Sequence, residues 1–166
     1  MEEPLVKIHY WLYPISWIYG MGVRLRNKLF DWGYYRSKSF DVPVVCVGNL
    51  AVGGTGKTPH TEYLIKLLQQ TGTNVAMLSR GYKRKSKGYV LATEETDVKR
   101  IGDEPYQIKT KFPAIRVAVD ENRCHGIEQL MKLDHPKVDV VLLDDAYQHR
   151  YVKALSLIHI SEPTRP

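Results

Sequence analysis

Cysteine is scarce in this chain. Its 166 residues include only Cys46 and Cys124, which form neither a C-x-x-C pair nor a metal-ligand spacing. The sequence therefore suggests neither a disulfide framework nor a zinc site, and a reducing compartment fits best.

Long apolar runs are also missing. No uninterrupted stretch of about 18 apolar residues argues for a membrane-spanning helix, and no small-residue cleavage site marks a signal peptide. Residues 5–30 instead mix Trp and Tyr with Leu, Ile and basic residues. Apolar residues recur there at three- and four-residue steps, namely Leu5, Ile8, Leu12, Ile15 and Tyr19. We expect an amphipathic helix, broken or kinked at Pro14, that either lies in a lipid interface or packs on the protein's own core.

The overall composition has no strong bias. With 43% hydrophobic and 25% charged residues it is that of an ordinary globular protein, and its length suits one folded α/β unit. The net charge of +6 favours acidic partners. Nucleotide phosphates, anionic lipid and nucleic acid all meet that description, so charge alone does not choose among them.

Glycine is concentrated in one segment. Residues 48–59 read GNLAVGGTGKTP and directly follow an apolar run. A strand, a glycine-rich turn and a helix start form the arrangement in which backbone N–H groups converge on a phosphate. We expect a phosphate-binding loop, although Ala51 stands where the pattern G-x-x-x-x-G-K-[ST] has glycine; an ordinary glycine-rich turn is the alternative. The expected nucleotide-binding residues are Gly53, Gly54, Thr55, Gly56, Lys57 and Thr58.

Strand and helix patterns alternate from residue 42 onward. Buried-type strands are predicted at 42–47, 75–78, 114–119 and 138–143, a short strand at 89–92, and helices at 60–70, 102–111 and 121–133. This alternation predicts an α/β fold with a mostly parallel sheet covered by helices on both faces.

The last predicted strand ends in two carboxylates, Asp144 and Asp145. Ligands bind at the carboxyl ends of the strands in open α/β sheets. Either carboxylate could therefore complete a magnesium site begun by the Thr58 hydroxyl. The alternative is that both cap the following turn.

A basic segment spans residues 80–87. It holds five basic residues and no acidic one, namely Arg80, Lys83, Arg84, Lys85 and Lys87. Such a loop either holds an anionic substrate or is simply solvated.

Four motifs together resemble the tetraacyldisaccharide 4'-kinase family, the lipid A 4'-kinases. They are GNLAVGGTGKTP at 48–59, SRGY at 79–82, GDEP at 102–105 and LDDAYQHR at 143–150, and the resemblance covers roughly residues 5–153. It implies a P-loop NTPase-like kinase whose loop carries a non-glycine residue at the position of Ala51. It also implies transfer of phosphate from ATP, with magnesium, to the 4'-hydroxyl of a tetraacylated glucosamine disaccharide 1-phosphate. The lipid acceptor places the enzyme at the cytoplasmic face of the bacterial inner membrane, with no nucleic-acid partner, and favours the interfacial alternative for residues 5–30.

The resemblance also implies roles for single residues. Lys57 becomes the phosphate-binding and catalytic lysine, Thr58 and Asp145 magnesium ligands, and Asp144 a neighbour that orders the metal site. Asp103 of GDEP becomes the general base, a role that can coexist with capping of its helix.

Further motif residues are assigned to the substrate. Arg80 and Tyr82 resemble family residues near the acceptor. His149 is grouped with them, although neither it nor Gln148 has a role that follows from the residues themselves.

The far end of the chain departs from the family. Family members continue through a second α/β region, whereas residues 155–166 resemble translated sequencing-adapter sequence and show no helical or strand period consistent with that region. We expect three parts: an interfacial helical segment at 1–40, an incomplete P-loop kinase core at 41–154, and a non-native tail at 155–166. A fragment of this kind would bind nucleotide poorly without the absent lobe.

Two rival functions fit less of the sequence. A P-loop GTPase should carry an N-K-x-D segment, but Asn27-Lys28 is followed by Phe30 where the aspartate should stand. A basic membrane- or nucleic-acid-binding module would account for the charge, but leaves the G-K-T loop and the two aspartates unexplained.

Overall fold

The computed structural model of the chain describes residues 13–49, 57–144 and 150–160. The chain forms two separate units, residues 1–37 and residues 38–166. Within the described residues, the first unit contains one helix, and the second contains the sheet with the remaining helices.

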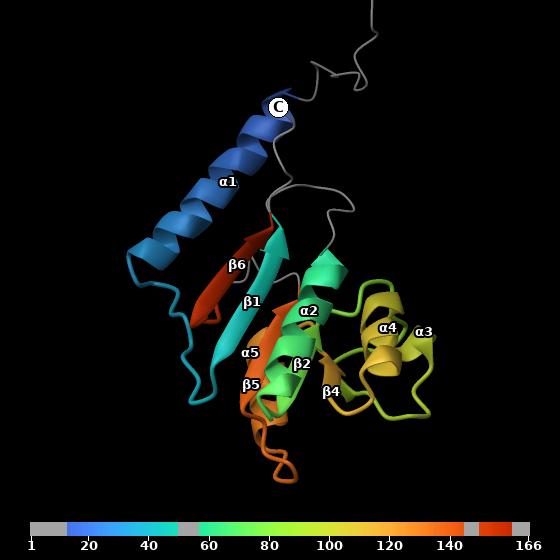
Figure 1. The fold of residues 1–166 in the computed structure, drawn as a ribbon. Helices are drawn as coiled ribbons and strands as arrows, with labels where there is room; N and C mark the ends of the chain where they lie inside the picture. The colour runs from blue at the N-terminus through green and yellow to red at the C-terminus, as the bar shows by residue number, and fades with distance from the viewer. Residues whose placement is uncertain (1–12, 50–56, 145–149, 161–166) are drawn as a thin grey trace, which may run out of the picture. The chain divides into compact units, whose positions relative to one another are not determined.

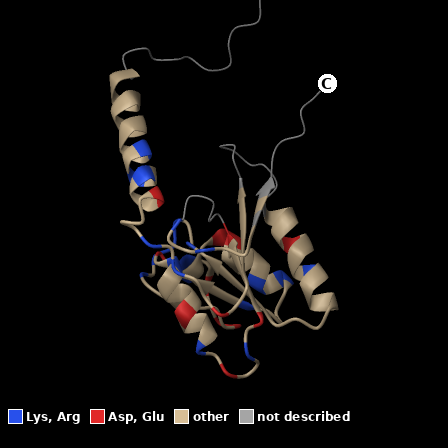
Figure 2. Ribbon diagram, turned by 90° about the vertical axis from the view of Figure 1, so that its left-hand side faces the viewer, with Lys and Arg blue, Asp and Glu red and all other residues tan. Residues whose placement is uncertain are grey.

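Helix α1, Tyr13–Asp31, makes up most of the described part of the first unit. Pro14 is the second residue of this helix, where proline is tolerated because an N–H of the first turn has no intrahelical partner to lose. The residues on the N-terminal side of the predicted break lie outside the described ranges. Its N-terminal half carries no charge, and its basic residues lie in the C-terminal half (Figure 2). Trp17 is 69% exposed and Tyr19 75%. No described helix is long and apolar enough to cross a membrane.

The second unit is built on a six-stranded sheet (Figure 1). Its strands are β1 (Val44–Asn49), β2 (Val75–Ser79), β3 (Val90–Leu91), β4 (Arg116–Val119), β5 (Val140–Asp144) and β6 (Ser156–Ile160). They lie in the order β3-β4-β2-β5-β1-β6, and every neighbouring pair is parallel except β3 with β4. The prediction of a mostly parallel sheet is confirmed.

Helices cover both faces of this sheet, as predicted. They are α2 (Lys57–Gln70), α3 (Val98–Ile101), α4 (Asp103–Lys111) and α5 (Arg123–Met131). One face packs against α5 through Ile127 and Leu130. The other packs against α2, α3 and α4, which contribute Ile65, Ile101 and Ile108.

Strand β2 shows how the sequence produces this two-sided core. All five of its residues are buried, and they alternate between the two clusters. Ala76 and Leu78 join the α5 side, whereas Val75 and Met77 join the α2 side. A continuous apolar run is the sequence pattern of a strand that is covered on both faces.

Two elements differ from the predictions. Helix α2 begins at Lys57 and not at residue 60, because Pro59 is tolerated in a first helical turn. No strand was predicted within residues 155–166, but Ser156–Ile160 forms β6 beside β1, with Val45 aligned to Ser156. A strand edge offers backbone N–H and C=O groups that an extended segment can pair with, whether or not its side chains alternate.

Candidate active site

The carboxyl ends of four parallel strands share one edge of the sheet. Strands β4, β2, β5 and β1 are direct neighbours and run in the same direction. Each leads into a segment that carries predicted site residues or polar side chains. This edge is where open α/β sheets bind their ligands.

The predicted phosphate-binding loop connects β1 to α2. Lys57 is the first residue of α2, and Thr58, the second, is half-buried. The first turn of this helix holds no acidic residue, so its positive end is free to attract an anion. Gly53, Gly54, Thr55 and Gly56 lie outside the described residues.

Asp144 is the last residue of β5 and is only 6% exposed. It is aligned with Val47 of β1, the strand that leads into the loop. Carboxylate and hydroxyl oxygens are the donors that Mg²⁺ prefers, and Asp144 and Thr58 supply one of each. The described residues include no cluster of three His, Cys, Asp or Glu side chains able to hold a metal, and Asp145, Gln148 and His149 lie outside the described ranges.

Asp103 is the first residue of α4, and the residue that caps this helix is Gly102. The alternative that Asp103 itself is the N-cap is therefore wrong. The Asp103 side chain is exposed, and no hydrogen bond or ion pair joins it to another described residue.

Two glycines bring the SRGY and GDEP motifs into contact. Gly102 has φ +91°, and a Cβ at this position would lie 2.8 Å from the carbonyl oxygen of Tyr82. Gly81 has φ +70°, and a Cβ there would lie 2.8 Å from the carbonyl oxygen of Ile101. Only glycine fits such backbone angles and such spacing without strain. The start of α4, with Asp103, thus lies directly against the segment that follows β2.

Arg80 and Tyr82 both extend from that segment into solvent. Tyr82 is 74% exposed, and the Lys83 ammonium lies 5.3 Å from the centre of its ring. The structure therefore brings two of the predicted substrate residues close to the predicted base.

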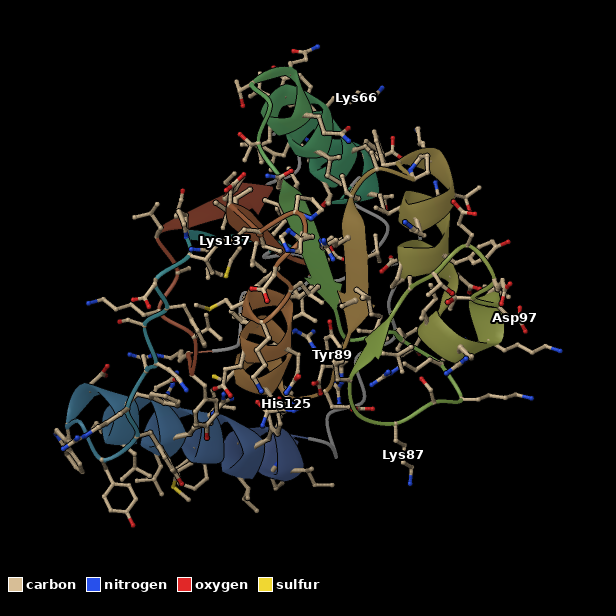
Figure 3. All side chains as sticks on the ribbon, turned by 90° about the horizontal axis from the view of Figure 1, so that it is seen from below. Lys66, Lys87, Tyr89, Asp97, His125 and Lys137 are labelled. Carbon is tan, nitrogen blue, oxygen red and sulfur yellow. The ribbon has the colours of Figure 1, made fainter. Side chains whose placement is uncertain are left out.

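Sequence analysis missed a polar cluster that follows β4. Asp120 is 2% exposed, and its carboxylate accepts a hydrogen bond from the Asn122 N–H at 2.9 Å and pairs with His125 Nδ1 at 2.7 Å. The Gln129 amide nitrogen lies 3.1 Å from His125 Nε2, so both ring nitrogens of His125 have polar neighbours. The rings of Tyr89 and His125 lie nearly perpendicular, with their centres 6.3 Å apart (Figure 3), and burial raises the pKa of Tyr89. The sequence did contain a pattern that could have indicated Asp120. It follows directly after the apolar run of β4, as Asp144 follows the apolar run of β5.

A cavity of about 550 Å³ opens beside this cluster, a volume in the range of small-ligand sites. Its lining consists of Glu121, Asn122, Arg123, Cys124 and Tyr151. Burial raises the pKa of Cys124, so its thiol stays protonated and unreactive at neutral pH.

Comparison with known proteins identifies relatives over most of this chain. The family model for tetraacyldisaccharide-1-P 4'-kinase matches residues 8–162. The tetraacyldisaccharide 4'-kinase of Bacteroides thetaiotaomicron is 69% identical over 153 residues, which are 92% of this chain and 40% of that protein. The enzyme of the same name from Parabacteroides distasonis is 56% identical, over 92% of this chain and 41% of that protein.

A solved structure resembles the fold as well. The crystal structure of LpxK from Aquifex aeolicus in complex with ATP matches with a TM-score of 0.79 and 40% identity, over 89% of this chain and 47% of that one. The chain thus spans about 40% of the length of the curated relatives it matches.

Proposed function

Because this chain belongs to the tetraacyldisaccharide-1-P 4'-kinase family, we propose that a protein carrying it at the full length of its relatives is a lipid A 4'-kinase. Such an enzyme transfers the γ-phosphate of ATP to the 4'-hydroxyl of a tetraacylated glucosamine disaccharide 1-phosphate. ATP as phosphate donor is supported by the ATP complex of the Aquifex aeolicus enzyme. The rival GTPase and nucleic-acid-binding functions find no support among these relatives.

One observation carries the proposal: the carboxyl end of β1, the start of α2 at Lys57 and the buried Asp144 of β5 come together at one sheet edge. We assign nucleotide binding to Gly53, Gly54, Thr55, Gly56, Lys57 and Thr58. Backbone N–H groups of the loop and the helix N-terminus would hold the phosphates, and Lys57 would neutralise charge that develops on them.

Magnesium fits the donor chemistry of this edge. Thr58, Asp144 and Asp145 would hold the ion, which when bound offsets the negative charge of the ATP phosphates. Asp144 is buried, so we assign it the task of keeping the site ordered next to Asp145.

Asp103 would accept the proton of the acceptor hydroxyl. Its carboxylate is exposed at a helix N-terminus and is in place to receive a proton without first breaking a described ion pair. Arg80, Tyr82 and His149 would contact the disaccharide, and the contact between Gly81 and the start of α4 supports grouping the first two with Asp103.

The acceptor is a lipid, so the enzyme has to work at a membrane surface. We assign membrane binding, at the cytoplasmic face of the inner membrane, to the segment 1–40. Residues 41–154 then form the kinase core, and residues 155–166 are a non-native tail. Exposed aromatic side chains and basic residues on α1 support the assignment, because Trp and Tyr favour the headgroup region.

The test is Lys57→Ala in the full-length protein, assayed with radiolabelled ATP and the lipid acceptor. Loss of a charge that acts on the transferred phosphoryl group should abolish measurable transfer. Lys66→Ala, on the exposed surface of α2, serves as the matched control and should retain activity. Near-normal turnover of Lys57→Ala would remove the loop from the mechanism.

A further inference from the structure

We propose that Arg84 is a positioning residue for phosphoryl transfer. Its buried guanidinium fixes the basic loop, residues 80–88, against the start of α4, so that Tyr82 and Asp103 meet the acceptor in one fixed arrangement. The inference rests on the proposed kinase function and adds to it a residue that does not itself touch the substrate.

Arg84 differs from the other cations of the basic loop. Its side chain is only 3% exposed, whereas Arg80, Lys83, Lys85 and Lys87 are all exposed. Lys87 points outward from the loop in Figure 3. Burying a guanidinium costs several kcal/mol unless its charge and its N–H groups find partners. Of the five cations, only Arg84 is held out of solvent. We therefore infer that its guanidinium has a structural task in the loop.

The partners of Arg84 tie the loop together. Its Nη2 forms an ion pair with the Glu121 carboxylate at 2.7 Å and donates to the Gly88 carbonyl at 2.8 Å. The other oxygen of Glu121 accepts the Gly88 N–H at 2.9 Å. Burial acts to raise the pKa of Glu121, but hydrogen bonds from the backbone N–H groups of Glu121 and Gly88, together with the Arg84 charge, lower it overall. Glu121 is therefore ionised at neutral pH and anchors the loop to the segment after β4.

A second set of bonds extends from Arg84 to the helices beyond the loop. Arg84 Nη1 donates to Ser86 Oγ at 3.0 Å, and Ser86 Oγ donates to the Arg100 carbonyl at 2.5 Å. The Lys85 N–H donates to the Lys99 carbonyl at 2.8 Å. Lys99 and Arg100 belong to α3, which ends one residue before Gly102. The guanidinium thus connects the segment after β4, the loop and the residues that lead into Asp103.

The aliphatic stem of Arg84 completes the connection. A Cβ on Gly81 would lie only 2.4 Å from Arg84 Cδ, so the stem packs directly on the Gly81 backbone. Gly81 is also the residue that faces the Ile101 carbonyl. If Arg84 moved, the Gly81 peptide would lose its support. The contact of that peptide with the residues leading into α4 would be lost at the same time.

This geometry predicts a particular kinetic pattern. Misplacement of a positioned group by about 1 Å can cost on the order of a hundredfold in rate. Arg84→Met keeps much of the stem but removes the charge and all five N–H donors. In the full-length protein we expect the KM for the lipid acceptor to rise and kcat to fall by tenfold to a hundredfold, while the affinity for ATP, which binds at the end of β1, stays within about twofold.

Three further variants and one control variant extend the test. Arg84→Lys restores the charge but not the forked geometry, so it should recover part of kcat and not all of it. Glu121→Gln should raise the acceptor KM in the same direction, and the double variant Arg84→Met/Glu121→Gln should be no worse than Arg84→Met alone. Lys66→Met, an exposed charge on α2, is the matched control and should change neither constant.

Amide hydrogen exchange on the same proteins measures the loop itself. In Arg84→Met the amides of Lys85 and Gly88 should exchange at least tenfold faster, with those of β2 unchanged, because these two bonds depend on the loop conformation. Unchanged exchange and unchanged acceptor KM in a folded Arg84→Met would overturn the proposal, as would equal loss of ATP and acceptor binding. A wild-type protein without kinase activity would instead overturn the proposed function, and exchange would still report on the loop.

Discussion

At the scale of single residues, the site uses the same chemical group for different tasks by placing it in different surroundings. Asp144 and Asp120 are buried at the ends of β5 and β4, whereas Asp103 is exposed at the start of a helix. A buried carboxylate is suited to hold a cation or to orient a neighbour. An exposed and unpaired one can accept a proton from an incoming hydroxyl.

The base role proposed for Asp103 and the magnesium role proposed for Asp145 can be tested by exchanging each of these two carboxylates for an amide in the full-length enzyme. Asp103→Asn should leave ATP affinity nearly unchanged while turnover falls by roughly a hundredfold or more, the usual contribution of a general base. Asp145→Asn should instead alter the dependence of the rate on magnesium concentration. Calorimetry of nucleotide binding and initial rates over a magnesium series distinguish the two. Wild-type turnover in a folded Asp103→Asn would mean that another group is the base.

At the scale of elements, α5 reaches the sheet through a glycine. A Cβ on Gly126 would lie 2.7 Å from a terminal methyl of Leu78 and 3.1 Å from the Asp120 Cβ. Leu78 is fully buried, so it has little space to move. The close approach of α5 to β2 therefore depends on the absence of a side chain at this position.

Gly126→Ala should accordingly destabilise the protein. Alanine favours a helix by up to about 1 kcal/mol over glycine, but overpacking a tight core usually costs about 1–3 kcal/mol. We expect a net loss on the order of 1 kcal/mol in the free energy of unfolding, measured by urea denaturation. Gly22→Ala in α1 is the matched control, since nothing lies within 4 Å of its Cβ position, and it should not lower stability. A stabilised Gly126→Ala protein would show that Leu78 moves aside easily.

The sequence was sufficient for what depends on local pattern. Continuous apolar runs located β2 and β5, and the glycine-rich turn after β1 predicted a following helix, although α2 begins three residues earlier than predicted. The sequence was not sufficient to predict features that depend on residues far away in the chain. The burial of Arg84 requires Glu121, and the capping role of Gly102 requires the nearby Tyr82 carbonyl. Strand β6 forms because β1 offers it a partner, which no periodicity within residues 156–160 reveals.

At the scale of the whole molecule, the two units have different surfaces. The sheet unit buries its large apolar residues in two clusters. Helix α1 instead leaves most of its large apolar side chains exposed, Trp17 and Tyr19 above all. Contiguous exposed apolar residues on a soluble surface usually mark a binding site for a partner or a lipid.

Removal of residues 1–30 should therefore weaken binding to lipid without unfolding the sheet unit. Co-sedimentation with anionic vesicles should fall by at least tenfold, because aromatic and basic side chains contribute together at the interface. The variant Trp17→Ser/Tyr19→Ser should reduce binding in the same direction while retaining the basic residues. Circular dichroism checks that both proteins are folded. Equal binding by intact and shortened protein would assign α1 to a protein contact.

The strand order also has a consequence for how the protein is made. Strand β1 lies between β5 and β6, so Val44 pairs with Val141 and Val45 with Ser156. A ribosome adds on the order of 5–20 residues per second, so β1 spends roughly 5–20 seconds outside the sheet before its first neighbour is synthesised. Pairing between segments so distant in the chain is also slow to form. We therefore expect newly made β1, with its apolar side chains and both hydrogen-bonding edges unpaired, to be open to aggregation or chaperone binding throughout this interval.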